Sequence, residues 1–171
     1  MNVSSLNRES RLNVEHCLSE KQLGKVLRKK DDYSDIFLFT YFDSINNNPY
    51  SLKLVMSLCY PFSKPELYLA SPLILYKYKS MERINDLKPD HEFHIYSKNA
   101  QGEIHICHSS DEQWDPSNTC VLVFLKGMLW VEAYCNYKQT GKSINDFFLE
   151  LQDRYLSSAS NIDILKKAIL L

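Results

Sequence analysis

A helical repeat of apolar residues in the second half of the chain constrains the fold more than any other feature. Asp115 is expected to cap the start of this helix, with Pro116 in its first turn. One face of the helix then carries apolar residues at helical spacing: Val121, Phe124, Leu125, Met128 and Leu129. Further apolar bulk lies elsewhere around the axis, at Val123, Trp130 and Tyr134. The segment is therefore predicted to be the central buried helix of the domain.

The first half of the chain carries strand patterns. Residues 36–42 are short, apolar and aromatic, and the turn-forming residues 46–49 follow them. Residues 52–59 alternate with period 2, with the buried face predicted at Leu52, Leu54, Met56 and Leu58. A proline-bearing link, residues 60–65, leads to another strand at 67–70. These strands predict an antiparallel meander.

Weaker patterns flank this central part. Residues 4–19 are weakly amphipathic and predict a first helix, and residues 24–28 predict a short strand. Gly141 is expected to end the central helix. A capping box at residues 143–146 predicts a further helix with a stripe of Phe147, Phe148, Leu151 and Tyr155, and Ser160 is expected to cap a last helix carrying Ile162, Leu165 and Ile169. The predicted class is α+β, in a single domain over residues 1–171.

Composition and charge argue against some classes of partner and location. The chain has 171 residues, of which 44% are hydrophobic, enough for one core. Lysine plus arginine (20) nearly balances aspartate plus glutamate (21), so neither nucleic acid nor an anionic membrane is an expected partner. The N-terminus is polar, and no apolar run approaches the roughly 20 residues that span a bilayer. A cytoplasmic protein is expected.

The five cysteines are an odd set without CxxC spacing. This argues against a disulfide framework and against a zinc ribbon or finger. Cys120 and Cys135 fall within the predicted central helix and are expected to lie in or near the core. No cofactor is expected.

Residues 71–115 form a long irregular segment, with a possible helix only at 81–87, and such a segment inside a compact domain is a candidate functional region. It ends near Cys107, which stands between His105 and His108 and shortly before a predicted helix start that would favour a thiolate. A reactive nucleophile, a zinc ligand in a loose cluster with the nearby histidines, and a buried apolar filler all remain open for this cysteine. Trp114 is expected to anchor the core beneath the helix.

An ordered set of residues runs through the middle of the chain: Tyr60-Pro61-Phe62-Ser63-Lys64-Pro65, His94, Gly102, Cys107, Trp114 and Pro116, followed by the apolar helix. Over about residues 35–142 this order resembles the ubiquitin-conjugating-enzyme family in its divergent bacterial branch. In that family a Tyr-Pro-Phe-x-x-Pro link leaves the meander, a His-Pro-Asn tripeptide begins the active-site loop, and the catalytic cysteine precedes a tryptophan and the second helix. The resemblance implies an N-terminal helix, a small antiparallel meander, a long active-site loop and C-terminal helices.

Two further patterns, Trp130-x-x-x-Tyr134 and Thr140-Gly141, resemble stand-alone conjugating-enzyme relatives from bacterial antiphage operons of the CBASS type. The resemblance implies that Cys107 forms a thioester and passes the acyl group to a target amine. It also implies an activating enzyme or its substitute as one partner. The other partner would be a ubiquitin-like modifier or the C-terminus of a cyclic-oligonucleotide synthase.

The resemblance assigns His94 to the opening of the active-site loop. Ile95 and Tyr96 follow it in place of proline and asparagine, and Asn99 is the nearest substitute for the asparagine that assists transfer. His105 and His108 are candidate bases beside the cysteine, and the polar groups considered as oxyanion donors are Asn99, Ser109 and Ser110. The expected catalytic set is Cys107, His94, Asn99 and His108. The alternatives are a non-catalytic binding module of the same fold and a zinc-dependent hydrolase.

Overall fold

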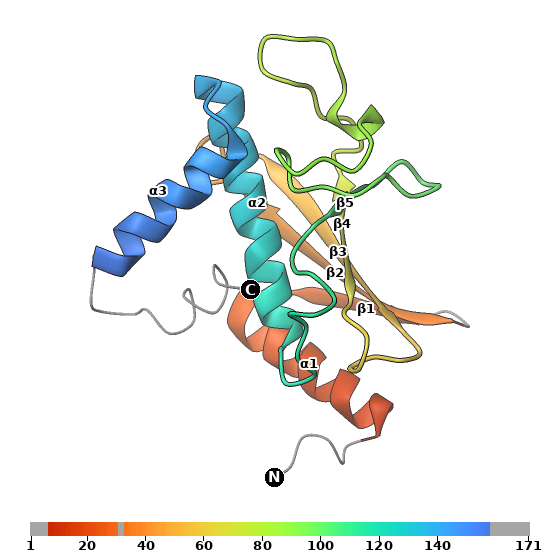
Figure 1. The fold of residues 1–171 in the computed structure, drawn as a ribbon. Coiled ribbons are helices and arrows are strands. Elements are labelled where there is room, and N and C mark those ends of the chain that lie inside the picture. The colour runs from red at the N-terminus through yellow and green to blue at the C-terminus, as the bar shows by residue number, and fades with distance from the viewer. Residues whose placement is uncertain (1–6, 31–32, 158–171) are drawn as a thin grey trace.

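A computed structural model describes residues 7–30 and 33–157, with side chains as far as residue 150 (Figure 1). The elements in chain order are α1 (Arg8–Leu23), β1 (Val26–Lys30), β2 (Ser34–Phe42), β3 (Pro49–Ser57), β4 (Glu66–Ser71), the 3-10 turn η2 (Ile84–Asp86), β5 (Ile104–Ile106), α2 (Cys120–Thr140) and α3 (Ile144–Ser157). The predicted α+β class is confirmed. No helix within these ranges has the length and apolar character needed to cross a membrane.

The five strands form one antiparallel meander in the order β1-β2-β3-β4-β5. Strand register aligns buried residues across the sheet, because partners on neighbouring strands point to the same face. One such row runs through Phe37, Leu54, Leu67 and Ile106, each no more than 1% exposed. The sheet therefore presents a continuous apolar face to the helices.

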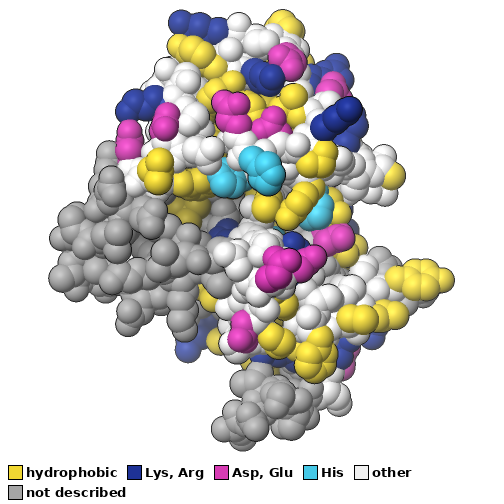
Figure 2. All heavy atoms as spheres, in the orientation of Figure 1, with side chains coloured by type: hydrophobic (Ala, Val, Ile, Leu, Met, Phe, Trp, Pro, Cys, Tyr) yellow, Lys and Arg dark blue, Asp and Glu magenta, His cyan; other side chains and the backbone are white. Residues whose placement is uncertain are grey.

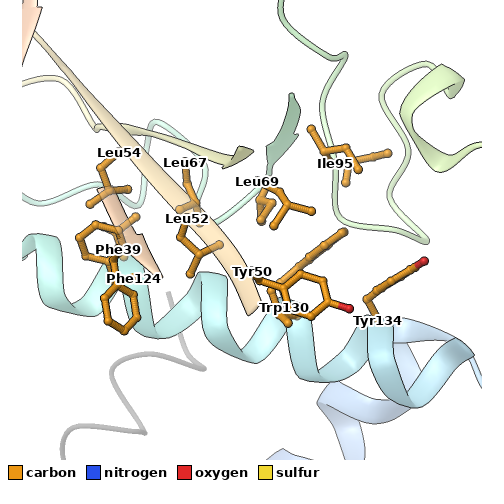
Figure 3. Close-up of a cluster of buried hydrophobic side chains, with 14 of the residues drawn as sticks. Phe39, Tyr50, Leu52, Leu54, Leu67, Leu69, Ile95, Phe124, Trp130 and Tyr134 are labelled. Atoms are coloured by element: carbon orange, nitrogen blue, oxygen red, sulfur yellow. The ribbon is translucent and has the colours of Figure 1, made fainter. Parts of the chain in front are cut away.

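Helix α2 packs across this face, with α1 beside its N-terminal end (Figure 1). Leu52 and Leu67 point from the sheet toward Phe124 and Trp130 of the helix (Figure 3). Helix and sheet approach each other closely at Gly127, since a Cβ atom there would lie 2.9 Å from Leu52 Cδ1. The absence of a side chain at this position lets helix and sheet come close together.

The buried stripe of α2 differs from the predicted one. Of the five residues expected on it only Phe124 is buried, while Val121, Leu125, Met128 and Leu129 are partly exposed. The buried residues instead centre on Gly127, and they are Cys120, Val123, Phe124, Gly127, Trp130, Val131, Ala133, Tyr134 and Cys135. Glycine has no apolar side chain, so the pattern of apolar residues did not indicate that α2 contacts the sheet on the face that contains Gly127.

The predicted start of α2 at Asp115 and Pro116 is also wrong. The helix begins at Cys120, with the Thr119 side chain as its N-cap, while Asp115 accepts a hydrogen bond from a backbone amide two residues further on. A distant residue also holds this end of the helix, because the Cys120 amide donates to the buried carboxylate of Glu15 in α1 at 2.7 Å. Arg11 pairs with that carboxylate at 2.6 Å and so offsets part of the cost of burying the two charges, while Arg11 Nε has no hydrogen-bond partner.

Most of the remaining predicted elements are confirmed. The first helix, the strand at 24–28 and the three meander strands correspond to α1 and β1 to β4. Gly141 ends α2 in a left-handed conformation (φ 77°), and the Ser143 hydroxyl accepts from the Asp146 amide at the start of α3. The expected helix capped by Ser160, and the side chains of Leu151 and Tyr155, lie outside the described residues.

Three details of the sequence-based account are wrong. Leu58 is 61% exposed, because β3 ends at Ser57 and the chain turns away from the core. The helix expected at 81–87 is only the 3-10 turn Ile84–Asp86. Finally, the segment treated as irregular contains β5, which pairs with β4 through Leu67 and Ile106.

Candidate functional site

Cys107 immediately follows β5 and is held next to His94 by the backbone. Its amide donates to the His94 carbonyl at 2.8 Å, and the Tyr96 amide donates to the carbonyl of His105 at 2.8 Å. An isolated bridge joins Ile95 to Ile106 in the same region. Residues 94–96 thus run alongside the end of the sheet and bring the two parts of the long segment together.

A cavity of about 680 Å³ lies beside Cys107. Five parts of the chain line it: His94, the end of β5, the loop that starts with Cys107 and His108, helix α2 through Lys126 and Trp130, and the first turns of α3. The apolar side chains on the wall are Ile106, Leu129, Trp130, Phe148 and Leu149. A volume of this size holds a short extended peptide or a small organic group.

The Cys107 thiol is half-buried and donates a hydrogen bond to the Tyr96 hydroxyl at 3.2 Å. Through this hydrogen bond the thiol raises the pKa of Tyr96, which therefore keeps its proton at neutral pH. A hydroxyl proton rotates, so Tyr96 can accept from the thiol or donate to a negative sulfur or oxygen at the same place. The Lys64 ammonium lies 5.5 Å from the centre of the Tyr96 ring.

His108 also lines the cavity, but its ring nitrogens are both engaged. Nε2 lies 2.7 Å from the Pro65 carbonyl oxygen and so donates to it, while the Ser109 hydroxyl lies 3.1 Å from Nδ1. Burial lowers the pKa of His108 to about 4, against a smaller opposing effect of the bond to Pro65. In this arrangement His108 is a neutral, structural histidine that supports the loop under Cys107.

His105 lies outside the cavity wall, between two tyrosine rings. Its ring centroid is 4.7 Å from that of Tyr68 and 4.8 Å from that of Tyr96. Burial lowers the pKa of His105, so it is neutral as well. Neither histidine that flanks Cys107 in sequence therefore supplies an imidazolium beside the thiol.

His94 links the site to helix α3. Its backbone has a positive φ of 51°, and its Nε2 is hydrogen-bonded to Asn145 Oδ1. The ring also packs edge-on against Phe148, with centroids 5.2 Å apart. His94 thereby brings the Asn145 amide to the cavity wall, where it is a potential hydrogen-bond donor.

Lys126 reaches the cavity from α2, and its ammonium donates to the His108 carbonyl. Burial lowers the pKa of Lys126 to about 8, which leaves a part of this amine neutral near physiological pH. The nearby Cys107 would oppose this shift if it carried negative charge. An amine and a thiol therefore share one partly enclosed space.

Asn99 is placed elsewhere. Its Oδ1 accepts from the amides of Gln101 and Glu103, both at 3.0 Å, and its Nδ2 donates to the Glu103 carboxylate at 2.6 Å. It closes a turn and does not line the cavity. The structure thus brings Cys107, His94 and His108 to one cavity and leaves Asn99 outside it.

The other polar candidates have structural partners. The Ser109 hydroxyl is engaged with His108, and the Ser110 hydroxyl accepts from the Gln113 amide at 3.3 Å. In the same loop, Asp111 forms an ion pair with Lys64 at 3.0 Å. These contacts stabilise the conformation of the loop after Cys107.

Trp114, the other four cysteines and a metal site were also considered from the sequence. Trp114 is partly buried against the core and donates from Nε1 to the Pro61 carbonyl at 2.8 Å. The predicted burial of Cys120 and Cys135 is confirmed, whereas Cys17 and Cys59 are exposed. Over the described residues, no three histidine, cysteine, aspartate or glutamate side chains are close enough to hold a metal ion.

Sequence reasoning missed Tyr96, Lys126 and Asn145. Lys126 carried a usable signal, since it is a charged residue within the otherwise apolar run of α2. Tyr96 and Asn145 carried none, because they reach the site only through the pairing of residues 94–96 with β5 and the packing of α3.

Comparison with known proteins adds no relative, because the chain matches no protein-family model, no curated protein and no solved structure. A functional assignment therefore depends on the chemistry of the cavity and its residues.

Proposed function

We propose that the protein is a ubiquitin-conjugating-enzyme-like acyl carrier with Cys107 as its thioester site. The observation that carries this proposal is the half-buried Cys107 thiol, hydrogen-bonded to the Tyr96 hydroxyl beside a cavity of about 680 Å³. The order of elements gives further support, since a helix, an antiparallel meander, a long segment with the cysteine and a long helix follow one another as the resemblance implies.

The first chemical step is attack of the Cys107 thiolate on an activated acyl carbonyl. A thioester forms, and the previous acyl carrier leaves. The Tyr96 hydroxyl lies within hydrogen-bond distance of the sulfur, so it can donate to the thiolate before attack and to the developing oxyanion nearby. The apolar wall of the cavity accommodates the end of the acyl-bearing chain.

The second step passes the acyl group to an amine. In this step we assign Asn145, rather than Asn99, as the amide that assists the acceptor, because Asn145 is at the cavity wall and is oriented by His94. The acyl group would come from a ubiquitin-like modifier or from the C-terminus of a cyclic-oligonucleotide synthase. We place this chemistry in the bacterial cytoplasm, in an antiphage operon of the CBASS type.

The test is reconstitution with a candidate activating enzyme, ATP and a candidate modifier. Wild-type protein should give a band shift on a gel that thiol reductant removes. Cys107→Ser should give an oxyester that resists reductant, because the oxygen ester does not exchange with thiols. Cys17→Ser is the matched control, since Cys17 is an exposed thiol on α1 and its replacement should leave the reducible adduct intact.

Two results would count against the proposal. A reducible adduct that persists in Cys107→Ser would place the thioester elsewhere. A Cys107→Ala variant that keeps full biological effect in cells would favour a binding module that does not use the thiol.

A further inference from the structure

Two lysines lie near Cys107, and their surroundings differ. Lys64 is held by an ion pair with Asp111 at 3.0 Å and by the Ser109 carbonyl at 2.7 Å. Burial alone would lower the pKa of Lys64, but the Asp111 carboxylate and the Tyr96 hydroxyl raise it. Lys64 is therefore a firmly protonated cation.

Lys126 has a different environment. It projects from α2 into the same cavity as the thiol, and its ammonium donates to the neutral carbonyl of His108. Burial lowers the pKa of Lys126 to about 8, so roughly a tenth of it is neutral at pH 7. A neutral amine keeps a lone pair that can attack a carbonyl, whereas an ammonium does not.

We propose that Lys126 is an internal acyl acceptor, which takes the acyl group from the Cys107 thioester when no external amine is bound. The inference rests on the proposed role of Cys107 as the acyl carrier. It adds a modification site, the side chain of Lys126, whose substrate class is the acyl thioester formed in the same cavity.

The transfer is balanced without any co-reactant. The Lys126 nitrogen attacks the thioester carbonyl carbon, and a carbon–nitrogen bond forms. The carbon–sulfur bond then breaks, and its electron pair leaves with the Cys107 sulfur. The proton lost from the nitrogen goes to that sulfur, so the products are an amide on Lys126 and a regenerated Cys107 thiol. Confinement of both groups in one cavity favours this path over reaction in solution.

The experiment uses N-acetylglycine thiophenyl ester, a small thioester that acylates thiols without an activating enzyme. The full-length protein is incubated with it, sampled over time and treated with hydroxylamine, which cleaves thioesters and leaves amides. Peptide mass spectrometry then locates each acyl group. Wild type should show a transient thioester on Cys107 and a growing amide on Lys126.

Three variants sharpen the test. Lys126→Arg keeps a cationic donor for the His108 carbonyl but is not nucleophilic, and its Cys107 thioester should last about tenfold longer. Cys107→Ser should give no rapid amide on Lys126. Lys138→Arg is the matched control, because Lys138 is on the same helix and also donates to a backbone carbonyl, that of Lys77 at 2.8 Å. It should behave as wild type.

The outcomes separate the two proposals. If Cys107 forms a thioester that is equally long-lived in wild type and in Lys126→Arg, the internal transfer is wrong and the carrier role stands. An equal rate of amide formation on Lys126 in Cys107→Ser also overturns the transfer. If no thioester forms on Cys107 at all, both proposals fail. Should Lys126→Arg not fold, the wild-type and Cys107→Ser peptide maps alone decide the question.

Discussion

Three cysteines in this protein lie beside a tyrosine hydroxyl, in two contrasting regions. Between α2 and the sheet, Cys120 contacts Tyr60 at 3.5 Å and Cys135 contacts Tyr50 at 3.4 Å. At the end of β5, Cys107 contacts Tyr96 at 3.2 Å. The polar partner is the same in each case, so access to the surrounding space, rather than the partner, distinguishes the thiols.

Burial gives the two core thiols a structural role. It raises the pKa of Cys120 well above the ordinary value and raises that of Cys135 to about 11. Both thiols are therefore neutral and behave as small apolar groups. The Cys107 thiol, in contrast, is half-buried beside the cavity that also receives Lys126 and His94. This contrast, between a packed thiol and a cavity thiol, can be tested at several points.

The largest expected effect is on alkylation by iodoacetamide under native conditions. Cys120 and Cys135 should react at least about a thousandfold more slowly than Cys107, because they become reachable only when the core opens. Peptide mass spectrometry of timed samples measures each rate. In concentrated urea all five cysteines should react alike, which controls for intrinsic differences. Rapid native labelling of Cys120 would contradict the described core.

The next effect concerns the contact that holds the Cys120 end of α2. Glu15→Ala should lower the free energy of unfolding by about 4 kcal/mol, because Arg11 is left as a buried charge and the Cys120 amide loses its acceptor. Urea unfolding measures the change. Glu20→Ala on the same helix removes an exposed carboxylate and should change stability by less than about 0.5 kcal/mol. Equal losses in both variants would refute the proposed role of Glu15.

His108, at the cavity, should make the free energy of unfolding depend on pH. His108 has a folded-state pKa of about 4 and an ordinary value of 6.5, so between these values the unfolded chain binds a proton that the folded chain does not. Stability should therefore be lost as pH falls from about 6.5 to about 4, by roughly 3 kcal/mol in total.

Urea unfolding at several pH values checks this linkage in wild type and in His108→Gln. Glutamine keeps a donor for the Pro65 carbonyl but does not titrate, so the variant should lose this part of the acid sensitivity. An unchanged dependence on pH in the variant would show that other groups cause it.

A smaller effect is expected from the tyrosines that contact the three thiols. Tyr96→Phe should slow acylation of Cys107 about tenfold, since the donor beside the sulfur is removed. Tyr50→Phe and Tyr60→Phe should leave that rate unchanged and lower stability by about 1 kcal/mol each. Acylation assays sampled over time give the rate at Cys107, and urea unfolding gives the free energy of unfolding. An equal slowing in all three variants would point to a general loss of structure.

Local patterns were enough to predict most of the meander. Alternation in β3 and the left-handed end of α2 at Gly141 depend on residues next to one another, so both could be read from the chain. Strand β5 could not, because its three residues become a strand only by pairing with β4. The start of α2 has both a local and a distant contribution, since Thr119 caps it and Glu15 accepts from the Cys120 amide across 105 positions.

The residues of the candidate site likewise include some that could be predicted from the sequence and some that could not. Cys107 and His94 could be proposed from their order along the chain, and both lie at the cavity. Asn99 was proposed because it is near in sequence, yet its side chain closes a turn with Glu103. Asn145 lies at the cavity and Tyr96 lies beside the Cys107 sulfur because of tertiary packing, which no short motif encodes.

The most direct test of the account compares Cys107 with the exposed thiols of Cys17 and Cys59 in one sample. After brief treatment with N-acetylglycine thiophenyl ester, peptide mass spectrometry gives the hydroxylamine-sensitive acylation rate of each. If the cavity and Tyr96 equip Cys107 as an acyl carrier, it should react at least about tenfold faster than either exposed thiol, although it is less accessible. Acylation of Cys107 at a rate equal to or below that of Cys17 and Cys59 would contradict the account.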